Sequence, residues 1–344
     1  MTDRFLRACR CAPTDRTPVW FMRQAGRALP EYRALRERYT LLDLCRTPAL
    51  AAQMTVLPVQ RLGVDAAILF ADITLPLVGM GVAVDLVDGV GPVISEPLRS
   101  PGDVDRLRPL EPERDLPFVL EAISLVRRDC PVPLIGFAGA PFTLASYLVE
   151  GRGARDLLRT KRLLHGDPVT WHALLARLTD ATLAYLRAQV AAGAQAVQVF
   201  DSWVGALAPR DYAAGVLPHM RRLFAGLATL DVPAIHFGTG TAGLLSLMAQ
   251  AGGDVIGVDW RVRLGEAWAQ IGPRAIQGNL DPAVLLAPFP VVEAAAREIL
   301  DEAAGRPGHI FNLGHGVLPQ TPPEHLARLV ALVHETTAAA APAS

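Results

Sequence analysis

Eight short apolar segments alternate with longer helix-favouring stretches along this 344-residue chain, and this alternation restricts the fold more than any other feature. Segments that are apolar throughout are typical of strands buried on both faces of a parallel sheet. The predicted strands are 19–22, 66–70, 134–137, 196–200, 234–237, 255–258, 274–277 and 309–312. Parallel strands alternating with helices predict an α/β protein, a (β/α)8 barrel of the TIM type with extra helices. A doubly wound open sheet is the alternative.

The chain contains no Pro/Gly/Ser-rich linker that would divide it into halves. We therefore expect a single barrel domain over residues 1–344, with 1–16 as a lead-in and 338–344 as a frayed tail. Helices are predicted at 168–192, 242–250 and 291–304. Residues 77–117, rich in Gly, Pro and charged residues, predict a long excursion after the second strand.

Composition sets limits on the class of protein. Hydrophobic residues make up 51% and charged residues 19% of the chain, which predicts a large core. A net charge of −1 gives no general attraction to nucleic acid or membranes. The four cysteines lack the spacing of a zinc site or a disulfide framework. Without an apolar leader or a bilayer-length apolar run, a cytoplasmic location is expected.

Polar residues and glycines follow the predicted strands, at the points where a parallel barrel gathers its catalytic groups in one mouth. Helix capping explains Asp281, because Pro282 suits the first helical position. Capping explains Arg23, Asp72 and His315 poorly, since Arg and His are weak N-caps. Asp72 comes after a strongly apolar strand, where a lone Asp is usually a cap or an ion-pair partner.

Two further patterns suit an anionic ligand. Arg23 and Arg27 flank a small-residue turn, and a guanidinium binds carboxylate in a bidentate manner at any working pH. The alternative for such a pair is a solvated surface ion pair. Residues 136–151 predict a strand, a Gly-rich turn and a helix whose first N–H groups face an anion, with Tyr147 one turn into that helix.

Residues 18–33 and 136–151 resemble the two signature stretches of the uroporphyrinogen decarboxylase family nearly end to end. Residues 200–203, 277–282 and 312–316 resemble further blocks of that family. The resemblance implies a distorted barrel, a homodimer, and no metal or organic cofactor. It also implies a reaction in which the four acetate arms of uroporphyrinogen III become methyl groups, giving coproporphyrinogen III and carbon dioxide.

The resemblance also assigns residues. The matching catalytic positions are Arg23, Asp72, Tyr147 and His315. The substrate-binding set implied by the resemblance adds the rest of the turn, one hydroxyl and an apolar floor: Gln24, Ala25, Gly26, Arg27, Ser202, Phe137 and Phe200. The proton donor stays open between Arg23, Tyr147, His315 and a bound water, and Trp203 receives no role.

Two other functions use related residues. A zinc-dependent corrinoid:thiol methyltransferase of the same superfamily carries a His-x-Cys pair and a later Cys. This chain has His236-Phe237-Gly238 and Gly314-His315 at those places, so the thiolate ligands are missing. A non-catalytic porphyrinogen-binding protein would use the same binding residues as the enzyme.

Overall fold

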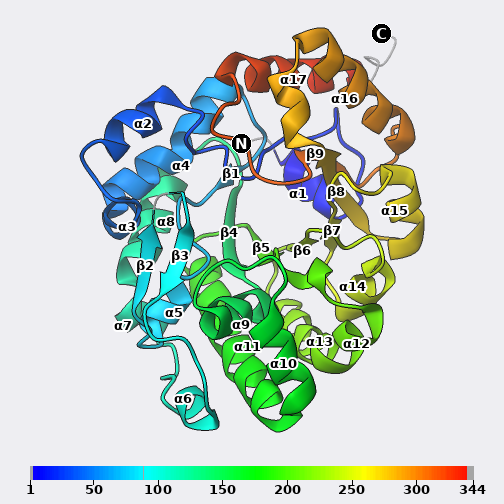
Figure 1. Ribbon diagram of the computed structural model, residues 1–344. Helices are drawn as coiled ribbons and strands as arrows, with labels where there is room; N and C mark the ends of the chain where they lie inside the picture. Colours follow the sequence, from blue (N-terminus) through cyan, green and yellow to red (C-terminus); the bar gives the residue numbers. More distant parts are fainter. Residues whose placement is uncertain (1–2, 88, 339–344) are drawn as a thin grey trace.

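Seven parallel strands form one sheet in the computed structural model, which describes residues 3–87 and 89–338 (Figure 1). The sheet order is β1-β4-β5-β6-β7-β8-β9, so the strands of this sheet are arranged in chain order. This order excludes the doubly wound sheet, in which the strand order reverses. The strands are β1 (Ala67–Ile68), β4 (Leu134–Gly139), β5 (Ala196–Asp201), β6 (Ala234–Gly238), β7 (Val255–Gly257), β8 (Ala275–Leu280) and β9 (His309–Leu313).

The segment around Val19 joins the two ends of this sheet. Val19 forms a parallel bridge with Phe311 of β9. On its other side, the amide of Asp65, just before β1, donates to the Val19 carbonyl at 2.7 Å. The segment thus occupies the eighth strand position of a TIM-type barrel, and the predicted fold is confirmed. The predicted strand at 19–22 is reduced to a single bridge, because the chain turns at once, with the Gln24 amide bonded to the Phe21 carbonyl.

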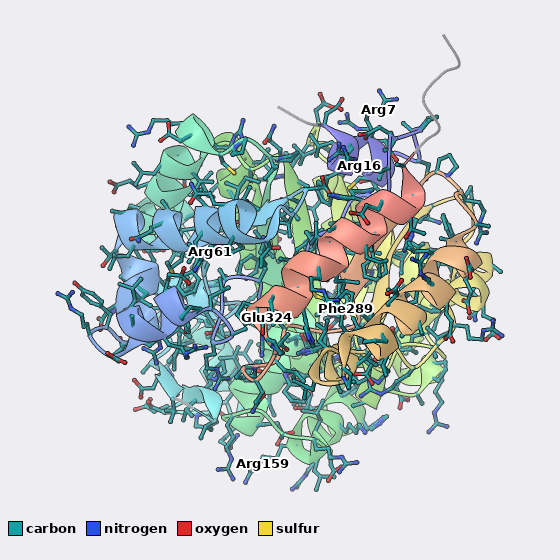
Figure 2. The ribbon with its side chains drawn as sticks, turned by 90° about the horizontal axis from the view of Figure 1, so that it is seen from above. Arg7, Arg16, Arg61, Arg159, Phe289 and Glu324 are labelled. Carbon is teal, nitrogen blue, oxygen red and sulfur yellow. The ribbon has the colours of Figure 1, made fainter. Side chains whose placement is uncertain are left out.

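A buried carboxylate, Asp65, fixes this closure. Its Oδ2 accepts a hydrogen bond from the Val19 amide at 2.8 Å and lies 2.7 Å from Nε2 of His334 in α17 (Pro323–Thr337). Arg4 of α1 (Arg4–Cys9) donates to Oδ1. Figure 2 shows α17 between α4 (Pro48–Leu62) and α16 (Phe289–Ala303), both of which it contacts. One side chain therefore ties helices from both ends of the described chain to the barrel.

A hydrogen-bonded chain of side chains crosses the barrel interior. Trp20 Nε1 donates to Gln277 Oε1 of β8 at 3.0 Å, and Gln277 Nε2 donates to Gln198 Oε1 of β5 at 3.0 Å. Buried polar groups normally find such partners, since leaving them unpaired is costly. The chain ties the Val19 segment to two strands that are not its neighbours.

The helices surround the strands, as Figure 1 shows. The predicted helices correspond to α11, α14 and α16, although α14 begins three residues later than expected. The excursion after β1 contains an unpredicted hairpin, β2 (Val84–Val87) and β3 (Gly91–Ile94). The remaining helices are α2 (Pro30–Arg36), α3 (Leu41–Arg46), α5 (Leu75–Gly79), α6 (Pro101–Asp105), α7 (Pro112–Asp115), α8 (Pro117–Asp129), α9 (Pro141–Glu150), α10 (Leu158–Gly166), α11 (Pro168–Ala191), η1 (Val204–Ala206), α12 (Pro209–Gly215), α13 (Leu217–Leu227), α14 (Leu245–Ala251), α15 (Leu264–Ile271) and η2 (Pro282–Leu286).

Two smaller expectations concern the ends of elements. The cap at Asp281 is confirmed, because its carboxylate accepts from the Ala283 amide at 2.9 Å at the start of η2. The tail expected to fray, 338–344, lies outside the described residues except for Ala338.

Within the described ranges, no helix combines the length and apolar character needed to cross a bilayer.

Replacing Asp65 with alanine tests the closure. We expect Asp65→Ala to lower the free energy of unfolding by roughly 3 kcal/mol, because it leaves the part-buried Arg4 and His334 without their shared acceptor. Urea unfolding measures the loss. Asp231→Ala is the control, since that exposed carboxylate only approaches Arg10 at 3.6 Å and should matter by less than about 1 kcal/mol. Equal effects of the two substitutions would contradict the role of Asp65.

Candidate active site

A cavity of about 710 Å³ opens at the carboxyl ends of the strands. The cavity is lined by ten of the eleven residues that the sequence predicted to bind the ligand. Gln24 is the exception. The lining comes from the exits of the Val19 segment, β1, β4, β5 and β9, together with the β2–β3 hairpin. The structure therefore brings together residues that are far apart in the chain, as a barrel mouth does.

The turn after Val19 presents two guanidinium groups. Arg23 has a left-handed backbone, with φ +59°, which directs the chain into the turn. Its side-chain stem lies against Gly316, where an added Cβ would be 2.4 Å from Arg23 Cδ. Arg23 and Arg27 are both exposed, and neither guanidinium bonds to another residue within 3–87 or 89–338. The surface-ion-pair alternative is therefore not what the structure shows.

Gln24 has a different place from the expected one. It is buried, its Oε1 accepts from the Phe21 amide at 3.0 Å, and its Nε2 donates to the Ala66 carbonyl at 3.0 Å. Both ends of the amide are thus bonded to the backbone. Gln24 holds the arginine turn against the start of β1 and does not face the cavity, which corrects its assignment as a binding residue.

Asp72 lines the cavity and is held by one of its two carboxylate oxygens. Its Oδ1 accepts from the Thr74 amide at 2.8 Å and from the Thr74 hydroxyl. Among the described residues, Oδ2 has no hydrogen-bond partner and Asp72 forms no ion pair. The local bonds fix the carboxylate by one oxygen and leave the other available as an acceptor.

The sheet order places these groups around the mouth. The neighbouring strands around this part of the barrel are, in order, β9, the Val19 segment, β1, β4 and β5. The residues that follow these strands therefore come in the same order around the mouth. His315, Arg23, Asp72, Tyr147 and Ser202 therefore line the rim in that order. The carboxylate of Asp72 lies between the arginine turn and the helix that carries Tyr147.

Tyr147 of α9 packs against Trp203, with ring centroids 6.0 Å apart at 73°. Burial raises the pKa of the Tyr147 phenol, and the nearby Asp72 charge raises it further, while the hydrogen bond with Trp203 and the charge of Arg23 lower it. The phenol is therefore protonated at neutral pH and can donate. Trp203 lines the cavity, a role that the sequence did not indicate.

Asp201, a buried acid, is hydrogen-bonded to the helix that carries Tyr147. The Thr143 hydroxyl donates to Asp201 Oδ1 at 2.9 Å and accepts from the Trp203 amide at 3.3 Å. Thr143 lies one helical turn before Tyr147 on α9. Burial raises the pKa of Asp201 to about 7. The acid and the hydroxyl thus connect the end of β5 to the helix of Tyr147.

His315 is a neutral imidazole. Burial lowers its pKa to about 4, and the positive charge of Arg23 lowers it further, against an opposing contribution from Asp259. At neutral pH the ring therefore adds a hydrogen-bond donor and an acceptor to the rim, and no charge.

Aromatic rings form the apolar floor. Phe137 and Phe200 meet edge to face, with centroids 5.5 Å apart, and Phe200 meets Phe237 at 5.8 Å. Phe237, Arg155 and hairpin residues such as Leu86 and Pro92 also line the cavity. No sequence pattern identified Arg155 or the hairpin residues, because the hairpin and the α9–α10 connection carry no motif of their own.

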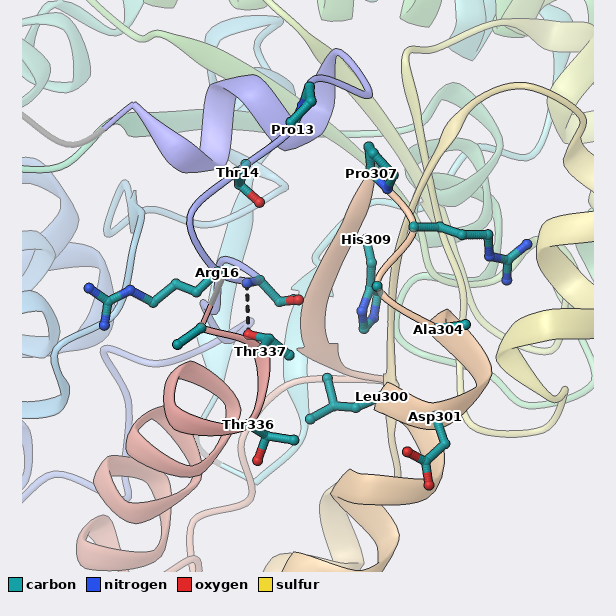
Figure 3. A pocket seen from close by; sticks show the side chains of 15 residues that line it. Pro13, Thr14, Arg16, Leu300, Asp301, Ala304, Pro307, His309, Thr336 and Thr337 are labelled. Atoms are coloured by element: carbon teal, nitrogen blue, oxygen red, sulfur yellow. Dashed lines mark hydrogen bonds between the residues drawn. The ribbon is translucent and has the colours of Figure 1, made fainter. Parts of the chain in front are cut away.

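A second hollow, of about 510 Å³, lies at the opposite end of the barrel (Figure 3). It is bounded by residues 13–17, by the connection that precedes β9, and by the end of α17, where the Thr17 amide donates to Thr337 Oγ1 at 2.9 Å. This end receives the amino ends of the strands. Barrel enzymes place their chemistry at the other face, so the candidate site is the cavity around Asp72.

The zinc alternative finds no ligand group in the described part of the chain. Among residues 3–87 and 89–338, no three His, Cys, Asp or Glu side chains form a group that could hold a metal ion. His236 is buried, it packs 4.9 Å from Phe224, and burial lowers its pKa to about 3.

A TIM-type barrel with an available carboxylate beside unpaired arginines at its carboxyl mouth defines an enzyme site for an anionic organic ligand. The model of the family described as Uroporphyrinogen decarboxylase (URO-D) matches residues 1–336. Uroporphyrinogen decarboxylase of a Thermus thermophilus strain is 57% identical over 338 residues, covering 98% of this chain and 99% of that protein. The Streptomyces griseus enzyme of the same name is 58% identical over 336 residues, covering 97% and 92%. The chain belongs to the uroporphyrinogen decarboxylase family.

Solved structures agree on the fold. A methyltransferase from Methanosarcina mazei superposes with a TM-score of 0.81 at 20% identity, covering 97% of this chain and 98% of that one. A B12-independent methionine synthase from Shewanella sp. W3-18-1 gives 0.59 at 11% identity, covering 84% and 87%. At these identities the likeness concerns the barrel alone.

The state of His315 can be measured directly. We expect its ring to titrate near pH 4 in the free protein, well below the ordinary value of about 6.5, because burial and Arg23 disfavour the imidazolium. An NMR pH titration, assigned by comparison with His315→Gln, gives the midpoint. Since the folded pKa lies below the unfolded one, this residue also costs stability as pH falls from 6.5 toward 4. A midpoint at or above 6.5 would refute the assignment of a neutral ring.

Proposed function

We propose that the cavity binds uroporphyrinogen III and that the protein removes carbon dioxide from its four acetate arms, giving coproporphyrinogen III. The chain is a carboxy-lyase of the family to which it belongs. The observation that carries the assignment of roles is the free oxygen of Asp72 between an unpaired arginine turn and a protonated tyrosine.

The substrate has the features that this cavity suits. Uroporphyrinogen is a flexible ring of four pyrroles whose N–H groups point inward and whose rim carries eight carboxylates. Asp72 Oδ2 accepts from the inner N–H groups, while Arg23 and Arg27 bind carboxylate arms in a bidentate manner. The face of the macrocycle lies over Phe137 and Phe200, where apolar contact is favourable.

The electrons of the broken bond need a sink, and the pyrrole itself supplies one. A proton added to the ring carbon beside the acetate-bearing carbon makes the ring cationic. Carbon dioxide then leaves, its bonding electrons enter the ring, and an exocyclic methylene remains. A proton added to that methylene and the loss of the first proton from the ring give the methyl group. The sum is one proton consumed and one carbon dioxide released.

Asp72 accelerates this sequence through charge. Its carboxylate interacts more strongly with the cationic ring than with the neutral ring that precedes it, so it stabilises the reaction's high-energy species more than the bound substrate. The proposed reaction needs neither pyridoxal nor thiamine, because the ring replaces their electron sink.

Tyr147 and His315 are candidate proton donors because both line the cavity, and a bound water stays the alternative. Tyr147 keeps its proton because its pKa is raised. His315 is neutral in the free protein, and substrate carboxylates beside it would raise its pKa and favour the imidazolium. Arginine has a planar fork that holds both oxygens of a carboxylate, so we assign Arg23 to binding the reacting acetate.

The assembly and the location are further predictions. We propose a homodimer that works in the cytoplasm, as a single barrel domain. Light scattering coupled to size-exclusion chromatography measures the dimer. A non-catalytic porphyrinogen-binding role is the second candidate, and it predicts tight binding without loss of carboxylates.

The substitution Asp72→Asn tests the proposed function. The asparagine keeps an acceptor for Thr74, so the fold should persist, but turnover should fall by about a hundredfold or more because the ring cation loses its counter-charge. The assay incubates protein with uroporphyrinogen under anaerobic conditions and follows the number of carboxylates per ring. Asp281→Asn is the matched control, since that carboxylate makes a similar local cap outside the cavity.

The outcomes separate the two candidates. Wild-type turnover with Asp72→Asn inactive supports the enzyme. Near-normal turnover of Asp72→Asn removes the central role of this residue. Tight binding by the wild type without any loss of carboxylates supports the carrier. Tyr147→Phe should lose less activity than Asp72→Asn, and an equal loss would identify Tyr147 as the acid.

A further inference from the structure

We infer that Arg155 is a second carboxylate-binding group of the cavity, on the other side of Asp72 from the arginine turn. This inference rests on the proposed function and names the residue that holds the arms of the substrate that Arg23 and Arg27 do not reach.

Arg155 lies in the connection between α9 and α10 and lines the cavity. Its side chain is exposed, and its guanidinium bonds to no other residue in the described part of the chain. An arginine in such a place is free to meet a ligand. Arg152, three residues earlier, is also exposed but does not belong to the lining.

The backbone that leads to Arg155 is anchored on two sides. The Ile94 amide of β3 donates to the Gly151 carbonyl at 2.7 Å, and Arg152 forms a backbone bridge with Val93. Gly153 lies against Trp203, where an added Cβ would be 3.3 Å from the indole. The connection is therefore held between the hairpin and the tryptophan at the wall of the cavity.

The sheet order fixes the side on which Arg155 stands. The Val19 segment lies on one side of β1, and β4, which leads into α9, lies on the other. Asp72 follows β1, so Arg155 and the arginine turn approach it from opposite directions. With Asp72 in contact with the centre of the ring, Arg23 and Arg27 reach the arms on one side only.

Charge supports the same assignment. The described lining contains three guanidinium groups against the single carboxylate of Asp72, and His315 is neutral. A ligand with carboxylates all around its rim needs cations on more than one side. Arginine suits this use because its planar fork binds both oxygens of a carboxylate.

The substrate side chain that Arg155 binds is either a propionate or an acetate, and both end in a carboxylate. The propionates persist through all four decarboxylations, whereas the acetates disappear one by one. A contact to a propionate contributes equally to every step, while a contact to an acetate weakens as the ring loses its arms.

The test compares Arg155→Ala with Arg152→Ala in the anaerobic decarboxylation assay. Arg155→Ala should raise KM about tenfold and leave kcat within about twofold, because the contact is made equally in the ground state and in the transition state. Arg155→Lys should recover part of the loss, since lysine keeps the charge but not the fork. Arg152→Ala should leave KM unchanged.

A second substrate identifies the arm. Uroporphyrinogen and the intermediate with a single remaining acetate should suffer the same fold-change in KM if Arg155 binds a propionate. A smaller change for the intermediate indicates an acetate. Both results support the site.

An unchanged KM for Arg155→Ala, or an equal rise for Arg152→Ala, overturns the inference, because a general charge effect would then explain everything. The proposed function would survive that result, since it depends on wild-type turnover and on Asp72→Asn. A wild-type protein that does not decarboxylate at all would refute the function instead.

Discussion

The closure of the barrel at Val19 is the constraint on which the site depends. On one side of Val19, the Pro18 carbonyl and the Trp20 amide bond to Phe311 of β9. On the other side, the Val19 backbone bonds to Asp65, and the turn that follows carries Arg23 and Arg27. Gln24 fixes this turn to the start of β1, the strand that Asp72 follows. Hydrogen bonds beneath the cavity therefore help to set the position of Arg23 and Arg27 relative to Asp72.

The charges of the cavity have a clear division. The guanidinium groups and the carboxylate of Asp72 share the rim, and the ionisable side chains of Tyr147 and His315 are neutral because burial opposes their charged forms. Burial thus leaves these two side chains uncharged at neutral pH, so they add no further cations to the cavity. This division suits a substrate that is anionic at its edge and becomes cationic at its ring during the reaction.

Sequence patterns predicted the parts of the fold that depend on long apolar runs and on strand exits. Asp72, Tyr147, Ser202 and His315 all follow strands that the pattern identified, so their meeting in one mouth was predictable from the barrel. The sequence could not show that Gln24 turns away from the cavity, because that depends on two backbone partners far from the motif. Arg155 was also missed, since its place depends on the β2–β3 hairpin, whose pairing no local pattern indicates.

A crystal structure of the protein with coproporphyrinogen, grown under anaerobic conditions, would show the roles of these side chains directly. Asp72 Oδ2 should accept hydrogen bonds from the inner pyrrole N–H groups, and Arg23 and Arg27 should contact carboxylate arms. A ring bound with its nitrogens directed away from residue 72, or outside this cavity, would contradict the central claim.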